Sequence, residues 1–390
     1  RDLWHIMEIA GPKTRVILTG DTAQHAPVAR GDAFRILQKH AGLRVAEVTE
    51  IRRQEVEDYK KAIEAISKGD LRTGFRRLDS LGAFVEIADE AQRHRELAAD
   101  YIALGRRGEF PLVVSPTHAE SAKVTNAIRE ARREAGQLGA EKKFLQYQNL
   151  QWEEAERQLP ENYRAGLVVQ FHQNAKGVKR GEIFKVLGQG ENGTVQIQNK
   201  AGNTRTLPLS EAAKFLVYEE REIALAKGDR IRITRNGEST NGKRLNNGNL
   251  LAVEKFGRKG EIILSNGAIL PANHGHIAHG YCQTSHSSQS RSVRDVLVAQ
   301  SADSFLASSR EQFYVSCSRG KQTLRIYTDN RRELQQAVSA IATGVFSPDD
   351  PTRYAGLMGG ESLIAVAGYG GLAWAPTIFI RVHEWPVGRV

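Results

Sequence analysis

The feature that most constrains the fold is a repeated alternation of short apolar runs with amphipathic helical segments. The runs are rich in β-branched residues and end at turn-forming residues, as buried parallel strands do. Strands are predicted at residues 14–19, 45–48, 84–87, 112–115, 295–298 and 324–327. Helices are predicted at residues 32–40, 55–68, 90–105, 121–135, 310–318 and 331–342. This order is typical of an open parallel α/β sheet.

The alternation is interrupted once, between about residues 167 and 270. Gly and Asn pairs recur there at close intervals, and runs such as residues 194–198 alternate with period two. Short strands joined by Asn-Gly turns are typical of small antiparallel barrels. The α/β pattern returns from Gly280, so the barrel is predicted to be an insertion inside one α/β domain.

The overall charge narrows the choice of partner. A formal net charge of +10 favours a polyanion such as nucleic acid, although solubility alone would also explain it. Cys282 and Cys317 have neither metal-ligand spacing nor partners for a disulfide framework, which suits a reducing cytoplasm, and no metal site is predicted. Residues 363–380 lack charges but contain several Gly, so an irregular tail is favoured over a membrane span.

A first polar motif, Gly20, Asp21 and Gln24, follows a predicted strand directly. Open α/β sheets bind ligands at the carboxyl ends of their strands. The Gln24 amide could donate to a γ-phosphate oxygen there and sense its loss after hydrolysis. A β-turn capped by an Asp is the structural alternative.

Two arginines stand out next, Arg53 and Arg319. Phosphoryl transfer builds charge on the equatorial oxygens, and a guanidinium fork stabilises that charge better than an ammonium group. Two arginines reaching across a cleft would couple its closure to the nucleotide state. Each arginine alone is more simply a solvated surface residue, and the argument for function depends on their combination with the other motifs.

The segment of residues 280–290 is dense in hydroxyls around one aromatic ring. Thr284 and His286 suit phosphate and sugar contacts along a single strand, and Tyr281 offers a stacking face. A Ser-rich loop between barrel and sheet explains the composition equally well. A basic groove is also predicted in the turn-rich region, near Arg230, Arg232, Arg235, Lys243 and Arg244.

The order of these motifs resembles superfamily 1 DNA helicases of the RecD-like branch. The nearest likeness is to the helicase part of conjugative relaxase-helicases of the TraI/TrwC (MobF) type, over residues 1–333. The resemblance implies a RecA-like parallel-sheet helicase domain with an inserted SH3-like β-barrel, plus the remnant of a first RecA-like domain. The implied segments are residues 1–45 (first-domain remnant), 46–165 (start of the second domain), 166–272 (barrel), 273–345 (rest of the second domain) and 346–390 (irregular tail).

The resemblance also implies an ATP- and Mg²⁺-dependent motor that moves 5′ to 3′ on single-stranded DNA. Its catalytic residues would be Gln24, Arg53 and Arg319, the last two as arginine fingers. Gly20, Asp21, Gln24, Gln289 and Arg319 would line the nucleotide site, and Thr284, His286, Tyr281, Arg230 and Arg232 would contact DNA.

One expected motif is missing: no G-x-x-x-x-G-K-[ST] phosphate loop occurs in the 390 residues. The phosphate loop, the Walker B carboxylates and the Mg²⁺ site are expected on an N-terminal motor domain before Arg1, which would be the chain's partner. The chain is therefore expected to be the C-terminal part of a conjugative or mobile-element helicase, and to be inactive alone. Two alternatives stay open, an ATP-independent single-stranded-DNA-binding fragment and a non-functional truncated gene product.

Overall fold

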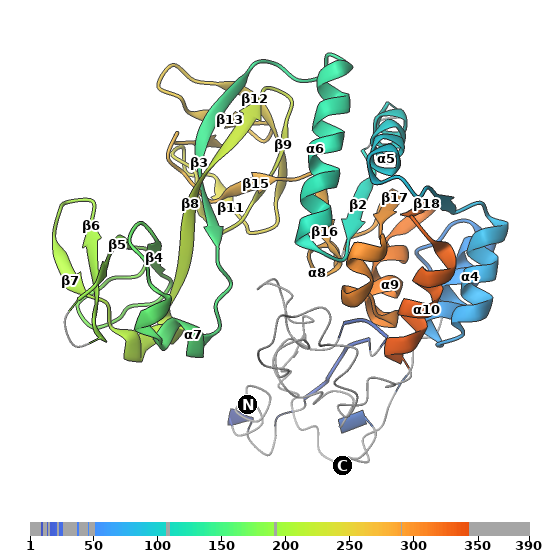
Figure 1. Cartoon of the computed structure of the whole chain (residues 1–390), viewed down its shortest axis with the longest axis horizontal. Helices are drawn as coiled ribbons and strands as arrows, with labels where there is room; N and C mark the ends of the chain where they lie inside the picture. The colour runs from blue at the N-terminus through green and yellow to red at the C-terminus, as the bar shows by residue number, and fades with distance from the viewer. Residues whose placement is uncertain are drawn as a thin grey trace, which may run out of the picture. The chain divides into compact units, whose positions relative to one another are not determined.

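The computed structural model describes residues 9–10, 14, 16–21, 23–25, 37–38, 46, 51–106, 110–190, 193–289 and 291–342. The chain divides into two compact units (Figure 1). Unit 1 comprises Arg1–Ala131 together with Cys282–Val390, and unit 2 is Arg132–Tyr281. Unit 2 is thus inserted into the sequence of unit 1. The predicted domain boundaries within these units stay predictions.

Unit 1 contains a five-stranded sheet in the order β1-β18-β17-β2-β16, and every neighbouring pair is parallel. The strands are β1 (Phe84–Glu86), β2 (Leu112–Ser115), β16 (Cys282–Thr284), β17 (Val293–Ala299) and β18 (Gly320–Thr328). All four residues of β2 are buried, as expected for a strand covered on both faces. The predicted strands at residues 84–87, 112–115, 295–298 and 324–327 are confirmed, and so is the parallel α/β class.

Helices of unit 1 accompany this sheet. They are α3 (Glu57–Ser67), α4 (Leu71–Ser80), α5 (Glu90–Gly105), α6 (His118–Glu134, which continues into unit 2), α8 (Ser285–Ser288), α9 (Arg310–Cys317) and α10 (Arg331–Ala342). Asp89 caps α5 by accepting a hydrogen bond from the Gln92 amide at 2.7 Å. Gly74 lets α4 approach α3 closely, since a Cβ there would lie 2.4 Å from Ile66 Cγ1.

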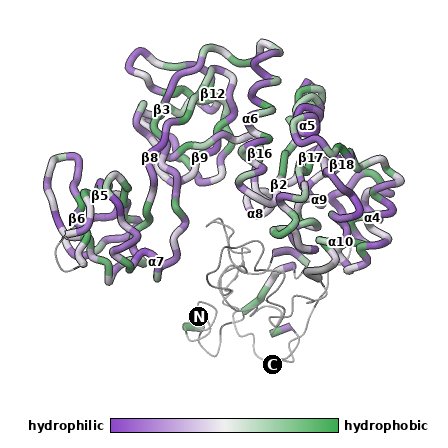
Figure 2. Tube along the Cα trace, in the orientation of Figure 1, coloured by the Kyte–Doolittle hydropathy of each residue, from purple (hydrophilic) through white to green (hydrophobic). Residues whose placement is uncertain are grey.

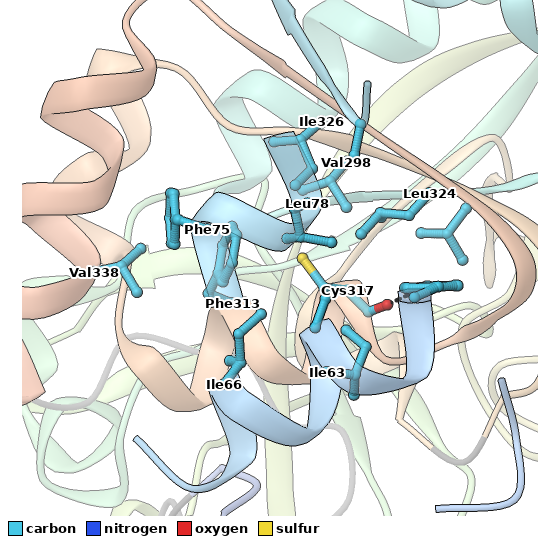
Figure 3. Close-up of a cluster of buried hydrophobic side chains, with 14 of the residues drawn as sticks. Ile63, Ile66, Phe75, Leu78, Val298, Phe313, Cys317, Leu324, Ile326 and Val338 are labelled. Atoms are coloured by element: carbon cyan, nitrogen blue, oxygen red, sulfur yellow. Dashed lines mark hydrogen bonds between the residues drawn. The ribbon is translucent and has the colours of Figure 1, made fainter. Parts of the chain in front are cut away.

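A hydrophobic core of unit 1 lies between α3, α4, α9, α10 and the sheet (Figure 3). Phe75 of α4 stacks on Phe313 of α9 with ring centroids 4.9 Å apart, and Leu78, Cys317 and Ile326 are fully buried beside them. These side chains come from segments on both sides of unit 2 in the sequence. The hydrophobic contact therefore joins the two halves of unit 1 into one body.

The predicted strand at residues 14–19 is wrong for the residues of this run that the structure describes. Thr14 and residues 16–19 form no strand, and the Ile17 side chain is 52% exposed. A strand needs hydrogen-bonded neighbours, and none of the described strands pairs with this run. The predicted helix at residues 32–40, the strand at 45–48 and the tail from 346 lie largely or wholly outside the described residues.

Unit 2 is built from antiparallel strands. A six-stranded sheet has the order β3-β8-β4-β5-β6-β7, a five-stranded sheet the order β14-β13-β12-β9-β15, and β10 pairs with β11. The strands are β3 (Glu141–Asn149), β4 (Val168–Phe171), β5 (Ile183–Gln189), β6 (Val195–Asn199), β7 (Thr204–Thr206), β8 (Phe215–Ala226), β9 (Arg230–Ile233), β10 (Gly237–Glu238), β11 (Arg244–Leu245), β12 (Leu250–Phe256), β13 (Ile262–Leu264), β14 (Ile269–Leu270) and β15 (Ile277–His279).

Unit 2 contains two large buried apolar clusters, the second of which also takes in Phe144 of β3 and Ile223 of β8, and Figure 2 shows the hydrophobic stretches along the strands. One cluster gathers around Phe171 and Phe215, and the other around Ile231 and Leu264. The antiparallel character predicted from the turn-rich sequence is confirmed. Gly267, with φ +74°, closes the turn between β13 and β14, where only glycine is unstrained. In the described part of the chain, no helix has the length and apolarity needed to cross a bilayer.

Candidate functional site

The segment carrying Arg53 is held against the turn between α9 and β18. Arg53 Nη1 donates to the Ser318 carbonyl oxygen at 2.8 Å, and its Nε donates to Ser292 Oγ at 2.8 Å. The buried Gln54 Nε2 donates to the carbonyl oxygens of Ser318 at 3.0 Å and Gly320 at 2.9 Å. Two predicted motifs therefore meet, and the side chains of Arg53 and Gln54 join them. Sequence reasoning gave Gln54 no role.

Arg319 occupies the centre of this turn. Its side chain is 1% exposed, and it donates to the Val315 carbonyl oxygen at 2.8 Å and to Ser318 Oγ at 2.9 Å. Burial, and then the charge of Arg53, lower the pKa of Arg319 to about 10, while Tyr314 and Asp21 act in the opposite direction. Arg319 thus stays cationic at neutral pH, although it forms no ion pair with any described residue. A buried cation without a counterion favours an anion beside it.

The loop of Gly20, Asp21 and Gln24 forms a capped turn. The Asp21 carboxylate accepts hydrogen bonds from the Ala23 amide and from Gln24 Nε2, both at 2.9 Å. Gln24 Oε1 in turn accepts from Gln289 Nε2 at 3.0 Å. The structure therefore brings together Gln24 and Gln289, which the resemblance assigned to one nucleotide site.

A stacked pair of imidazoles adds a second contact between the Gln24 loop and the segment of α8 and Gln289. The rings of His25 and His286 are parallel within 12°, with centroids 3.7 Å apart. Burial, His286 and Arg319, in that order, lower the pKa of His25 to about 3, so the ring is neutral near pH 7. No sequence signal pointed to His25, because periodicity and spacing do not relate residues this far apart.

Arg53, Arg319 and Gln24 therefore lie in one region of unit 1. The charge of Arg53 acts on Arg319, the charge of Arg319 acts on His25, and Asp21 acts on Arg319. The region combines guanidinium and amide donors with one carboxylate. Such a donor set suits phosphate oxygens.

The predicted DNA contacts fall in different places. Thr284 ends β16 at the carboxyl edge of the sheet, and its Oγ1 lies 2.9 Å from Ser287 Oγ, within α8. Thr284 and His286 belong to unit 1. Arg230 and Arg232 belong to β9 of unit 2, where both are half-buried and burial lowers the pKa of Arg232.

Tyr281 does not offer the predicted stacking face. Its side chain is 2% exposed, its hydroxyl donates to Asp229 Oδ1 at 2.7 Å, and the hydroxyl oxygen accepts from Arg132 Nη1 at 2.7 Å. The phenol thus connects the fully buried Asp229 to Arg132 inside unit 2. A base could reach the ring only if this packing opened.

The described residues fit the phosphate part of a nucleotide better than its metal. Arg53, Arg319 and Gln24 supply donors for oxygen atoms, as described above. Among the residues that the structure describes, no group of three or more His, Cys, Asp or Glu side chains could hold a metal ion.

Comparisons with known proteins find similarity to a domain family and to two conjugation proteins. A family model described as an AAA domain matches residues 1–89. The multifunctional conjugation protein TraI of Escherichia coli strain K12 is 25% identical over 422 aligned residues, covering 92% of this chain. A second Escherichia coli TraI is 24% identical over 389 residues, covering 85% of this chain. The chain spans about a quarter of these relatives' length, 23% and 21%.

Solved structures of Pif1 helicases also show some similarity. Bacteroides Pif1 with ADP-AlF3 and single-stranded DNA has a TM-score of 0.31 at 15% identity, covering 83% of this chain and 59% of that chain. Candida albicans Pif1 has a TM-score of 0.25 at 15% identity, covering 73% and 56%. Scores this low do not establish a shared overall fold.

Residues 1–89 therefore match a RecD-like AAA domain. More particularly, the chain is a distant homologue of TraI over most of its length.

Proposed function

We propose that this chain supplies the arginine-bearing side of the ATP site, and part of the single-strand contact, of a 5′-to-3′ DNA helicase acting in conjugation. The observation that carries the proposal is the meeting of Arg53, Gln54 and Arg319 at one turn, linked electrostatically to the Gln24 loop. Segments far apart in the sequence thus present guanidinium and amide donors in one region, and a shared anionic ligand would use them together.

The two arginines would act as fingers on the transferred phosphate. A guanidinium at the γ-phosphate stabilises the charge that develops on its oxygens during transfer. Arg319 is buried and already held by Val315 and Ser318, so little reorganisation is needed when the charge appears. Arg53 is half-buried, and its bonds to Ser292 and Ser318 orient it in the same way.

Gln24 would report the nucleotide state to the DNA contacts. Its amide is bonded to Asp21 and Gln289, and the next residue, His25, stacks on His286 of α8. Movement of the loop on loss of the γ-phosphate would therefore move α8, which begins directly after Thr284. In this proposal Thr284 and His286 contact the strand, and Gly20 and Asp21 shape the nucleotide loop.

The finer assignments of fold belong to the same proposal. The parallel sheet of unit 1 would be the second RecA-like domain, and unit 2 would include the SH3-like barrel. ATP and Mg²⁺ would be bound mainly by a phosphate loop and carboxylates outside these residues. We therefore expect the 390-residue chain alone to hydrolyse no ATP above background.

Directional unwinding by the complete protein that carries this chain tests the proposal. The motor proposal predicts ATP-dependent unwinding of a duplex with a 5′ single-stranded tail and little unwinding with a 3′ tail. Affinity for single-stranded DNA should also differ between nucleotide-free protein and protein with ADP–aluminium fluoride. Nucleotide-independent affinity without unwinding would support the alternative of a simple single-strand-binding protein.

A further inference from the structure

A second cluster of polar groups lies in unit 2, where the end of β9 meets the start of β15. The Thr234 amide donates to the His276 carbonyl oxygen at 3.1 Å, just beyond the antiparallel pair Ile233 and Ile277. Arg235 follows Thr234 directly. The pairing therefore brings Arg235 beside the turn that carries His274 and His276.

This turn is fixed against two tyrosines of the six-stranded sheet. The His276 ring centroid lies 5.2 Å from that of Tyr147 on β3 and 5.5 Å from that of Tyr218 on β8. The Gly275 carbonyl oxygen accepts from the Tyr147 amide at 2.8 Å. Gly275 has φ +73°, and a Cβ there would lie 2.3 Å from Tyr147 Cδ2, so only glycine fits. The geometry of the cluster is thus determined by packing.

Several polar atoms in this cluster lack a partner. The His276 side chain is 7% exposed, and its Nε2, like His274 Nε2 and Thr234 Oγ1, has no hydrogen bond within the described part of the chain. The half-buried Arg235 guanidinium forms no hydrogen bond or ion pair with any residue that the structure describes. Buried polar groups left unpaired cost free energy, so binding of a ligand that pairs them would be favoured.

The charges around the cluster decide which kind of ligand fits. Burial, and then the charge of Arg235, lower the pKa of both histidines, and burial together with the charge of Arg180 lowers the pKa of Arg235. Glu220, whose charge acts on Tyr147, is itself paired with Lys185 at 3.0 Å. A metal cation would be repelled by the guanidinium groups, whereas an oxyanion would be attracted.

We propose that Thr234, Arg235, His274 and His276 form a binding site for a phosphate group. The Arg235 fork would hold two oxygens, and the Thr234 hydroxyl and the histidine Nε2–H groups would donate to the others. The tyrosine rings would shield these bonds from water. The site lies wholly within unit 2 and uses no nucleotide chemistry, so it stands independently of the motor proposal.

Nuclear magnetic resonance of the histidine side chains in the full chain tests this site, with inorganic phosphate as the probe. We expect saturable shifts of the His274 and His276 signals and a rise in the pKa of His276 when phosphate binds. Arg235→Gln should weaken the binding by at least about tenfold, because a charge-assisted donor is lost. Arg258→Gln, which removes an exposed charge of the same unit, should leave it unchanged.

Arg235→Lys keeps the charge and should retain part of the phosphate affinity. Partial binding in Arg235→Lys would show that the weaker binding of Arg235→Gln comes from the lost charge and not from misfolding. A short single-stranded oligonucleotide that displaces phosphate would identify a phosphodiester as the ligand. Phosphate shifts that the oligonucleotide does not compete for would identify free phosphate. Absence of saturation, or equal weakening in Arg235→Gln and Arg258→Gln, would overturn the proposal.

Discussion

Arg53 and Ser318 lie 265 positions apart in the sequence, yet Arg53 Nη1 donates a 2.8 Å hydrogen bond to the Ser318 carbonyl oxygen. The adjacent Gln54 donates to the same oxygen at 3.0 Å. Because one carbonyl oxygen receives both side chains, the segment before α3 and the turn after α9 are held as one structure. The candidate ATP site depends on this connection.

Gln54→Ala should therefore destabilise unit 1. The substitution removes two buried hydrogen bonds and leaves the carbonyl oxygens of Ser318 and Gly320 with fewer donors. We expect a loss of about 1–3 kcal/mol in the free energy of unfolding, measured by urea denaturation. Gln92→Ala, at an exposed position of α5, is the matched control and should change stability by less than about 0.5 kcal/mol. Equal effects of the two substitutions would contradict this role for Gln54.

Tyr281→Phe should destabilise unit 2 without a comparable effect on DNA affinity. The missing hydroxyl leaves the buried Asp229 carboxylate and Arg132 without their shared partner, at a cost of about 1–3 kcal/mol. Tyr218→Phe is the control, because the Tyr218 hydroxyl forms no hydrogen bond with any described residue. If Tyr281→Phe kept its stability but lost DNA affinity, Tyr281 would be a DNA contact after all.

The stability of unit 2 should fall in acid because His276 is buried in its neutral form. Burial, Arg235 and His274 lower the pKa of His276 to about 3, against 6.5 in an unfolded chain. The unfolded state therefore binds more protons between these values, so stability is full above about pH 6.5 and declines as the pH falls towards 3. The slope reaches about 1.4 kcal/mol per pH unit for this group.

Urea denaturation at pH 7.5 and pH 5 measures this decline. His276→Asn should reduce the pH dependence, whereas His118→Asn, at an exposed position, should leave it unchanged. An identical decline in the His276→Asn protein would mean that other groups cause it.

Binding of single-stranded DNA should weaken steeply with salt. With about 3 to 5 phosphates neutralised, the logarithm of the association constant should fall with a slope of about −2 to −4 against the logarithm of salt concentration. Replacing both Arg230 and Arg232 by Gln should make the slope shallower by about 1.4, measured by fluorescence anisotropy. Replacing the exposed Arg72 and Arg76 by Gln removes the same charge from unit 1. An equal change there would argue against a groove at β9.

The sequence was sufficient for the elements of unit 1 with strong local patterns. The continuous apolar run of β2 and the Asp-capped periodicity of α5 specify their own structure, and both coincide with the predicted residues. Helix α4 was missed although Leu71, Phe75 and Leu78 recur at helical spacing; Gly74 weakens the helical signal while serving contact with Ile66. The prediction of a strand at residues 14–19 was wrong because a local apolar run does not show whether a neighbouring strand is present to form hydrogen bonds with it.

The site was only partly predictable. The motif order placed Arg53, Arg319, Gln24 and Gln289 together, and the structure brings them into one region. The stacking of His25 on His286 and the burial of Tyr281 depend on tertiary packing, which local residue types do not encode. A single sequence therefore identified which residue types could hold a phosphate but not which of them were already engaged.

ATP turnover by the complete protein in the presence of single-stranded DNA tests the central claim most directly. Arg53→Lys and Arg319→Lys keep the charge but lose the planar fork, and each should lower kcat at least about 100-fold with little change in KM. Arg95→Lys, at an exposed position of α5, should match the unchanged protein. Thermal unfolding would establish that each variant is folded. Unchanged kcat in folded Arg53→Lys and Arg319→Lys proteins would contradict the assignment of these arginines to the ATP site.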